Sequence, residues 1–210
     1  MSYLILVRHA KSEWNELGLW TGWTDVSLSK GGRKEAKKSA KHLKGFPIHK
    51  THTSRLKRAI ETWEILKDTL GLHKTKAVKH KALNEKHYGI FTGKNKWQVK
   101  EEVGEEIFQK IRRGWDHPIQ GGETLKEVHA RVVPYYQKKI LPDIRKGKNV
   151  LVVAHGNSLR PLVKYLENLS EEEVEKLEIG IAEIYIYEFD KKGFIVKKEI
   201  RAENKQRGKI

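Results

Sequence analysis

The sequence predicts an α/β fold, a three-layer α/β/α sandwich whose central sheet is mostly parallel and carries an antiparallel edge strand. Two continuous apolar runs, residues 4–7 and 150–154, are typical of strands that are buried on both faces of a parallel sheet. Helical patterns between these runs favour layers of helices on both sides of the sheet. Near the end of the chain, residues 183–200 form two alternating runs around an Asp-Lys-Lys-Gly turn, which predicts a hairpin at one edge.

Three elements are expected between residues 4–7 and the middle of the chain. Residues 29–44 are predicted to form a basic helix, and residues 48–53 a short strand. A further helix is predicted over residues 54–71, where apolar residues recur near helical spacing. Ser54 is the candidate N-cap of this helix, and Gly71 is its stop signal.

The middle of the chain is predicted to be helical. Residues 95–113 should form one or two helices that break near Gly104. A long helix is expected over residues 123–146, opened by a capping box that starts at Thr124, with two prolines as candidates to interrupt it.

Two shorter helices are expected after the second apolar run. One should cover residues 158–168, and the other residues 171–178, opened by a capping box of Ser170 and Glu173. The order of the strands in the sheet does not follow from any of these patterns.

One domain over residues 1–210 is the expected organisation. The chain has 210 residues and only 5 prolines, and no linker-like segment or internal repeat divides it. We expect residues 201–210 to form a flexible C-terminal tail.

Composition excludes several classes of function. The chain has no cysteine, so disulfides, thiolate catalysis and zinc–thiolate sites are ruled out. Its formal net charge is +16, but the lysines are scattered, which favours a solvated basic face over a nucleic-acid site. No segment has the pattern of a signal peptide or a membrane span. We therefore expect a cytoplasmic protein without nucleic-acid or membrane partners.

Arginine and histidine follow the ends of the two apolar strands. Arg8 and His9 come directly after the first strand, and His155 after the second. In open α/β sheets, ligands collect beyond the carboxyl ends of the strands. A neutral imidazole can attack phosphorus while cationic groups stabilise the phosphate oxygens, and Arg58 is a candidate third cation. These residues predict phosphoryl transfer through a phosphohistidine. No metal site is expected, since the histidines of residues 49–52 have no carboxylate beside them.

Longer stretches around these residues resemble the histidine phosphatase superfamily, and within it the 2,3-bisphosphoglycerate-dependent phosphoglycerate mutases. The short signatures are VRHAKS and AHGNS. Longer matches follow in the family's order, namely SEWNELGLWTGWTDVSLSKGGRKEA, TSRLKRAIET, LNEKHYGIFTGKNK, IRRGWD, GGETLKEV and VVAHGNSLRPLVKYLENLSEEE.

The resemblance implies a role for each matching residue. His9 would accept the phosphoryl group, Arg8, Arg58 and His155 would surround it, and Glu85 would exchange a proton with the substrate hydroxyl. Further residues would bind the substrate, namely Ser12, Asn15, Thr21, Gly22, Tyr88, Lys96, Arg112, Arg113, Gly156 and Asn157. The implied reaction interconverts 3-phosphoglycerate and 2-phosphoglycerate in glycolysis and gluconeogenesis. It needs 2,3-bisphosphoglycerate as primer and no metal, and the resemblance allows a homodimer.

Two alternatives stay open at this point. Ala10 and Lys11 stand where the family more commonly has Gly and Glu, and this pair is similar to that of small phosphohistidine phosphatases. A phosphomonoesterase on the same fold is therefore the first alternative. A basic nucleic-acid-binding protein is the second, although it leaves the ordered motifs unexplained.

Overall fold

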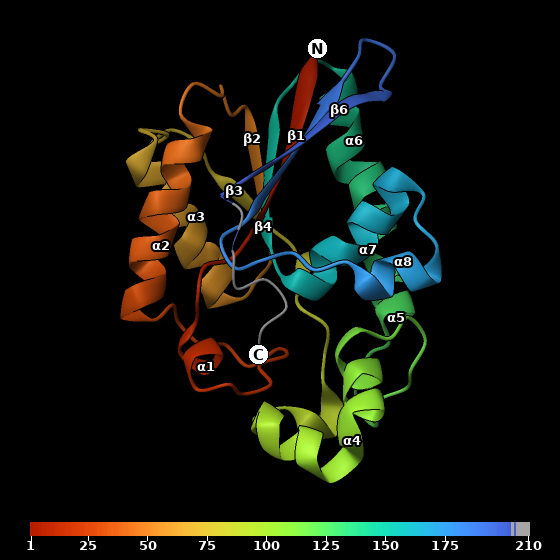
Figure 1. Cartoon of the computed structure of the whole chain (residues 1–210). Coiled ribbons are helices and arrows are strands. Elements are labelled where there is room, and N and C mark those ends of the chain that lie inside the picture. Colours follow the sequence, from red (N-terminus) through yellow and green to blue (C-terminus); the bar gives the residue numbers. More distant parts are fainter. Residues whose placement is uncertain (203, 205–210) are drawn as a thin grey trace.

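A six-stranded sheet forms the centre of the computed structural model, which describes residues 1–202 and 204 (Figure 1). The strand order is β3 (Ala77–Lys79), β2 (Lys50–Thr53), β4 (Val150–Ala154), β1 (Ser2–Arg8), β5 (Ile184–Phe189) and β6 (Ile195–Arg201). The first four strands run parallel, β5 is antiparallel to β1, and β6 is antiparallel to β5. The predicted fold class is confirmed. The antiparallel strand β5 lies one place inside the edge, and the predicted hairpin supplies both β5 and β6.

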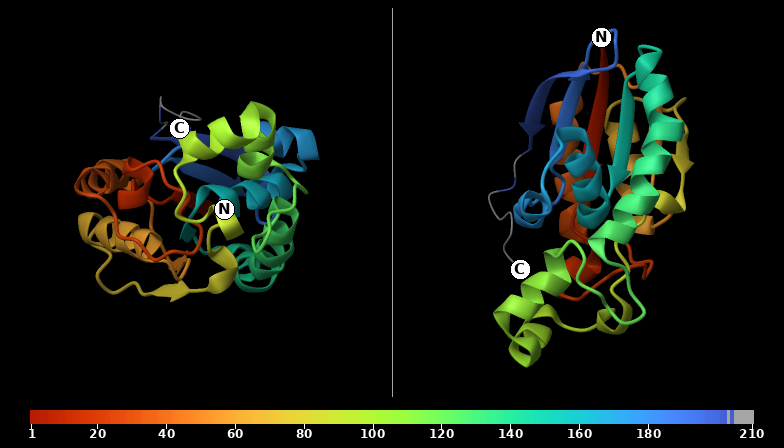
Figure 2. Two further views of the ribbon diagram at one scale, coloured as in Figure 1. Left: turned by 90° about the horizontal axis from the view of Figure 1, so that it is seen from below. Right: turned by 90° about the vertical axis from the view of Figure 1, so that its right-hand side faces the viewer.

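Helices cover both faces of the sheet, which gives the three predicted layers (Figure 2). Side chains alternate along a strand, so Ile5 and Val7 of β1 pack on one face with Trp63, while Leu4 and Leu6 pack on the other with Val128. The first face carries α2 (Lys30–Ala40) and α3 (Lys57–Thr69), and the second carries α5 (Leu125–Tyr135), α6 (Leu141–Arg145) and α7 (Gly156–Glu167). Both faces of β1 are therefore buried, as its continuous apolar run predicts.

Ser54 is not the N-cap of α3, so that prediction was wrong. The helix begins two residues later, with Leu56 at the N-cap position and no side-chain cap from Leu56 itself. The backbone N–H of Lys57, the first helical residue, donates to the Asp25 carboxylate at 2.6 Å. Because this acceptor comes from a distant segment, no local pattern could indicate it. The other end agrees with the prediction, since Gly71 follows the C-cap with a φ of 69°.

The expected break in α4 (Lys96–Arg113) is confirmed, because Gly104 has a φ of 78° inside the helix. The predicted long helix opens with the expected Thr124 capping box, and the chain stays helical through both of its prolines. A π-helical stretch, Tyr136–Ile140, separates α5 from α6, so the prolines accompany a change of winding without ending the helical run.

The remaining elements differ from the predictions mainly at their ends. Helix α7 begins at Gly156, two residues before the predicted start, and α8 (Glu171–Lys176) ends two residues before the predicted end, although its capping box is present. The helix predicted over residues 29–44 is α2 followed by a 3-10 turn, Lys41–Leu43. Short elements without a strong periodic pattern were not predicted, namely α1 (Glu13–Glu16), β3 and the 3-10 turns Lys81–Leu83 and Gly89–Phe91.

The predicted flexible tail lies largely outside the described residues, which omit residues 203 and 205–210; Arg201 is the last residue of β6. Within the described residues, no helix has both the length and the apolar character needed to cross a membrane.

Candidate active site

The central strands β1 and β4 place His9 and His155 side by side. Arg8 pairs in register with Ala154. Each is the last residue of its strand, and the residue that follows it is a histidine. The backbone N–H of His9 donates to the carbonyl of Ala154 at 2.9 Å, and the two imidazole centroids lie 4.9 Å apart with their planes at 60°. Both rings are buried. The predicted meeting of the two histidines is therefore a direct consequence of parallel pairing.

The imidazole of His9 is held in one tautomer. Its Nδ1 lies 2.7 Å from the carbonyl oxygen of Ala10, and a carbonyl can only accept, so Nδ1 carries the proton. The lone pair is then on Nε2. Burial, followed by the charges of Arg58 and Arg8, holds the pKa of His9 well below its usual value. The ring is neutral at physiological pH, which is the form that can act as a nucleophile.

His155 is oriented by a residue from a third strand end. Its Nε2 lies 2.7 Å from the hydroxyl of Ser54, which follows β2. Burial lowers the pKa of His155 well below 6.5, and the charges of Arg58, His9 and Arg8 add to this effect. Its Nδ1 is buried without a hydrogen-bond partner in the described part of the chain.

Two arginines are fixed beside the histidines by backbone carbonyls. Arg8 donates from Nη1 to Ile179 at 2.6 Å, and Arg58 donates from Nη2 to Gly22 at 2.8 Å and from Nη1 to Thr24 at 3.1 Å. Burial lowers the pKa of Arg58 to about 10, so it is still charged at pH 7. Two oriented guanidinium groups and a neutral imidazole form a suitable environment for a transferring phosphoryl group.

Glu85 is buried, and backbone groups orient its carboxylate. Oε1 accepts from the N–H groups of Lys86 at 2.8 Å and Asn157 at 3.2 Å. The ammonium group of Lys86 does not pair with it, because Lys86 donates from Nζ to the carbonyl of Ile111 at 2.7 Å. The backbone carbonyl of Glu85 accepts from Trp23 Nε1 at 2.6 Å. This arrangement fixes the carboxylate at the cavity, where it is well placed for proton transfer.

These groups line one open cavity. All predicted site residues line it except Ser12 and His155. Ser12 caps α1 and contacts Asn15, and the imidazole of His155 packs against that of His9. The lining residues are Arg8, His9, Asn15, Leu19, Trp20, Thr21, Gly22, Arg58, Glu85, Tyr88, Lys96, Arg112, Arg113, Gly156, Asn157, Arg160, Glu178 and Ile179.

Helix α4 closes the far end of the cavity. It lies beyond the carboxyl ends of β1 and β4 in Figures 1 and 2, and it supplies Lys96 from its first turn and Arg112 and Arg113 from its last. Burial, together with the charges of Arg112 and Arg8, lowers the pKa of Lys96 to about 8. A second group of cations therefore faces the cavity from the side opposite the sheet.

The family model of the histidine phosphatase superfamily (branch 1) matches residues 4–200. The chain belongs to this superfamily. It is 44% identical to a 2,3-bisphosphoglycerate-dependent phosphoglycerate mutase of Parvibaculum lavamentivorans, with 95% of this chain and 96% of the relative covered. It is 42% identical to a phosphoglycerate mutase of Schizosaccharomyces pombe, with 94% of each chain covered.

Two solved structures share the fold. One is Bacillus stearothermophilus YhfR, with a TM-score of 0.81, 25% identity and 93% of this chain and 94% of that chain covered. Another is a mycobacterial glucosyl-3-phosphoglycerate phosphatase, with a TM-score of 0.79, 21% identity and 95% and 97% coverage. The latter likeness shows the common fold alone.

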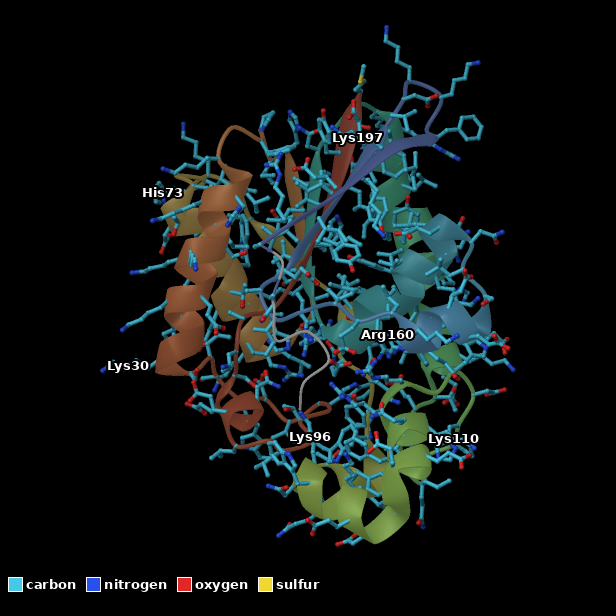
Figure 3. All side chains as sticks on the ribbon, viewed as in Figure 1. Lys30, His73, Lys96, Lys110, Arg160 and Lys197 are labelled. Carbon is cyan, nitrogen blue, oxygen red and sulfur yellow. The ribbon has the colours of Figure 1, made fainter. Side chains whose placement is uncertain are left out.

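Within this superfamily fold, Arg160 is a cavity residue that the sequence analysis missed. It lies one helical turn after Asn157 on α7, and its Nη1 donates to Asn157 Oδ1 at 2.6 Å. The amide nitrogen of Asn157 in turn donates to the hydroxyl of Tyr88 at 2.5 Å. Figure 3 shows Arg160 on α7 and Lys96 at the beginning of α4. The i, i+3 spacing from the AHGNS motif was the available signal.

Glu178 is another cavity residue that was missed. Its carboxylate lies between Arg113, at 2.8 Å, and Arg112, at 3.5 Å. It comes from the segment between α8 and β5, where no sequence motif marks it. The pairing depends on the approach of α4 to that segment, which local patterns do not describe.

Several buried polar atoms of the cavity have no hydrogen-bond partner in the described residues, among them Arg8 Nε, Thr21 Oγ1 and Arg113 Nε. Buried polar groups in folded proteins are nearly always paired, so these atoms need a polar partner, which water or a polar ligand in the cavity can supply. The lining carries six lysine and arginine side chains and two carboxylates. The ligand that fits this arrangement is an anion with charge at both ends.

Ala10 and Lys11, which kept the phosphatase alternative open, do not line the cavity. Ala10 is buried, and its N–H donates to the hydroxyl of Thr62 at 3.1 Å. Lys11 Nζ lies 3.9 Å from Glu35 Oε1. Neither side chain therefore distinguishes the two activities by contact with a ligand.

The histidines of residues 49–52 have structural partners. His52 Nδ1 lies 2.8 Å from the hydroxyl of Tyr135, and His49 Nδ1 accepts from the N–H of Asn149 at 2.9 Å. In the part of the chain that the structure describes, no group of three or more histidine, aspartate or glutamate side chains is placed to hold a metal.

Proposed function

We propose that this protein interconverts 3-phosphoglycerate and 2-phosphoglycerate, with His9 carrying the phosphoryl group between turnovers. The observation that carries this proposal is the cation group at each end of one cavity. Arg8 and Arg58 flank His9 at one end, and Lys96, Arg112 and Arg113 lie at the other. A phosphatase needs to grip only the phosphate that it removes, whereas a mutase must also hold the rest of a phosphorylated acid. The mutase names of relatives at 42–44% identity support the same reaction.

The first half of the reaction transfers a phosphoryl group from His9 to the substrate. The free 2-hydroxyl of 3-phosphoglycerate attacks phosphorus, the bond from phosphorus to Nε2 of His9 breaks, and the hydroxyl proton passes to Glu85. Nε2 regains its lone pair because Nδ1 keeps its proton on the Ala10 carbonyl. Arg8, Arg58 and His155 stabilise the charge on the phosphate oxygens.

The second half returns the other phosphoryl group to His9. Nε2 attacks the phosphate on the 3-oxygen, the bond between phosphorus and that oxygen breaks, and Glu85 returns the proton to the oxygen. The products are 2-phosphoglycerate and phosphorylated His9, so the enzyme is ready for the next cycle. The bisphosphorylated intermediate is also the primer, since it can phosphorylate a free His9. The unpaired donors and excess of cations fit such a doubly phosphorylated acid.

This reaction places the protein in glycolysis and gluconeogenesis, in the cytoplasm, with small phosphoglycerates as its partners. Holding the substrate at both ends also keeps the phosphorylated histidine covered, which limits attack by water.

The test is to locate the phosphoryl group and to follow its fate. Protein incubated with 32P-labelled 2,3-bisphosphoglycerate should carry an acid-labile label that disappears in His9→Ala and persists in His73→Ala, a change at an exposed histidine. Mutase flux should exceed phosphate release with 3-phosphoglycerate and should require primer after dephosphorylation. Predominant phosphate release would support the phosphomonoesterase alternative. Full primer-independent flux in His9→Ala would rule out the phosphohistidine route.

A further inference from the structure

Glu178 places a negative charge inside a cavity that is otherwise built for anions. Its carboxylate lies 2.8 Å from Arg113 Nη2 and 3.5 Å from Arg112 Nη2. The three side chains are between 15% and 19% exposed, so they are only weakly screened by water. An ion pair in this position differs from an ordinary surface pair, because the cations it occupies face the ligand.

The neighbouring residue contacts the other end of the cavity. The carbonyl of Ile179 accepts from Arg8 Nη1 at 2.6 Å, and both residues line the cavity. Two adjacent residues of one segment therefore supply acceptors to cations at both ends. A ligand with two anionic groups needs the same donors. At the His9 end a phosphate competes only with a neutral carbonyl, whereas at the α4 end an anionic group competes with a full carboxylate.

This difference between the two ends matters for a ligand that has to turn round. In the proposed reaction, the bisphosphorylated intermediate presents first one phosphate and then the other to His9. Each exchange requires the group at the α4 end to leave Arg112 and Arg113. Departure of that group removes a negative charge from beside two largely buried guanidinium groups, which is unfavourable unless another carboxylate approaches them. Glu178 is close enough to both to take the place of the departing group.

We propose that Glu178 is a specificity-determining residue that competes with the distal anionic group of the ligand for Arg112 and Arg113. It weakens the grip on doubly anionic ligands and thereby allows the intermediate to reorient and the product to leave. The identity of the ligand rests on the proposed function, but the competition itself follows from the ion pairs. A ligand that occupies only the His9 end does not compete with Glu178, so its affinity depends little on this carboxylate.

The experiment compares Glu178→Gln with Glu199→Gln. The control also removes one carboxylate paired with an arginine, because Glu199 lies 2.6 Å from Arg201, but it is outside the cavity. Dissociation constants for 2,3-bisphosphoglycerate and for inorganic phosphate are measured by calorimetry with proteins that also carry His9→Ala, so that no phosphoryl group is transferred. The values of kcat and KM are measured by mutase assay with His9 intact. In Glu178→Gln we expect bisphosphoglycerate to bind about tenfold more tightly, phosphate affinity to change less than threefold, and kcat and KM to fall together. Glu199→Gln should match the wild type.

The other outcomes are equally decisive. Weaker or unchanged binding of bisphosphoglycerate in Glu178→Gln would mean that Glu178 only holds the arginines in place, which overturns the proposal. An equal gain for both ligands would indicate a general charge effect and would also overturn it. If Glu178→Gln does not fold, Glu178→Ala is tested for the same pattern. Because binding is measured without turnover, a wild type that binds but lacks mutase flux would contradict the proposed function and leave this inference standing.

Discussion

The hydroxyl of Ser54 lies 2.7 Å from Nε2 of His155, and both residues are fully buried. Ser54 follows β2 and His155 follows β4, so the contact joins two neighbouring parallel strands at the end that carries the active site. The serine that local sequence favours as a helix cap thus fixes the second histidine of the site.

Replacing Ser54 by Ala should lower kcat about tenfold. The change leaves a buried imidazole nitrogen without its partner, at a cost of about 1–3 kcal/mol, and lets the ring turn away from the phosphate. Steady-state mutase kinetics measure the effect. Ser2→Ala is the matched control, because the buried Ser2 hydroxyl donates to the carbonyl of Ile144 at 2.9 Å, near the opposite end of β1. Ser2→Ala should lower the free energy of unfolding and leave kcat unchanged. Equal kcat values for the two variants would contradict the role of Ser54.

Substrate capture should weaken as the pH rises through about 8. The pKa of Lys96 is about 8 because Lys96 is buried near Arg112 and Arg8, so the free enzyme loses this cation above that pH. The value of kcat/KM, which reports the free enzyme, should therefore fall on the alkaline side. Lys96→Arg should move the fall to higher pH, since arginine stays charged.

The matched control for this pH profile is Lys94→Arg, near the same helix but outside the cavity lining. Its profile should be that of the wild type. An unchanged alkaline limb in Lys96→Arg would assign the limb to another group, such as the buried Lys86, whose pKa is lowered to about 7.

Stability should decrease on the acid side partly because of His52. Burial lowers the pKa of His52 to about 4, with Lys50 and His80 lowering it and Asp143 opposing them. The unfolded chain binds a proton near pH 6.5 while the folded chain does not, so the free energy of unfolding falls as the pH drops from 6.5 towards 4. Between pH 7 and pH 5, this difference in the pKa of His52 lowers the free energy of unfolding by about 2 kcal/mol.

Urea unfolding of His52→Asn at pH 7 and pH 5 tests this contribution. The variant should lose about 2 kcal/mol less than the wild type over this interval. The pKa values of His9 and His155 are also lowered, so these two histidines should still decrease the free energy of unfolding of His52→Asn at acid pH. His73→Asn, at an exposed histidine, should behave as the wild type. The same acid-side loss in His52→Asn and in the wild type would contradict the assignment.

Arg131→Lys should lower kcat about tenfold with a smaller effect on KM. The guanidinium donates to the carbonyls of Ala82 at 2.7 Å, Asn84 at 3.0 Å and Glu85 at 3.0 Å, and it thereby holds the loop that presents the Glu85 carboxylate. A lysine keeps the charge but cannot span three carbonyls. Arg33→Lys, at an exposed ion pair, is the control. A pure increase of KM in Arg131→Lys would argue against positioning of the proton-transfer group.

Local sequence was sufficient for much of the fold. The continuous apolar runs of β1 and β4 indicated buried parallel strands, and the hairpin, the Thr124 and Ser170 capping boxes and the Gly104 break were found where the patterns placed them. These features depend on residues close together in the chain. The strand β3 has three residues, two of them exposed, and too short a pattern to predict.

The two histidines of the site could also be predicted, because parallel pairing of β1 and β4 brings their ends together. The other cavity residues came from motif resemblance, and the structure gathers nearly all of them around one cavity. Arg160 and Glu178 were missed because their importance depends on which backbone carbonyls and arginines approach them from other elements.

The sequence by itself determined the fold class, the paired histidines and the anionic character of the ligand, since these follow from hydrophobic periodicity, local spacing and residue chemistry. Only the tertiary structure decided that Asp25 caps α3, that Ser54 holds His155, and that Glu178 pairs with Arg112 and Arg113. Each of these contacts joins segments far apart in the chain. Their partners are selected by the packing of helices against the sheet, which no local pattern encodes.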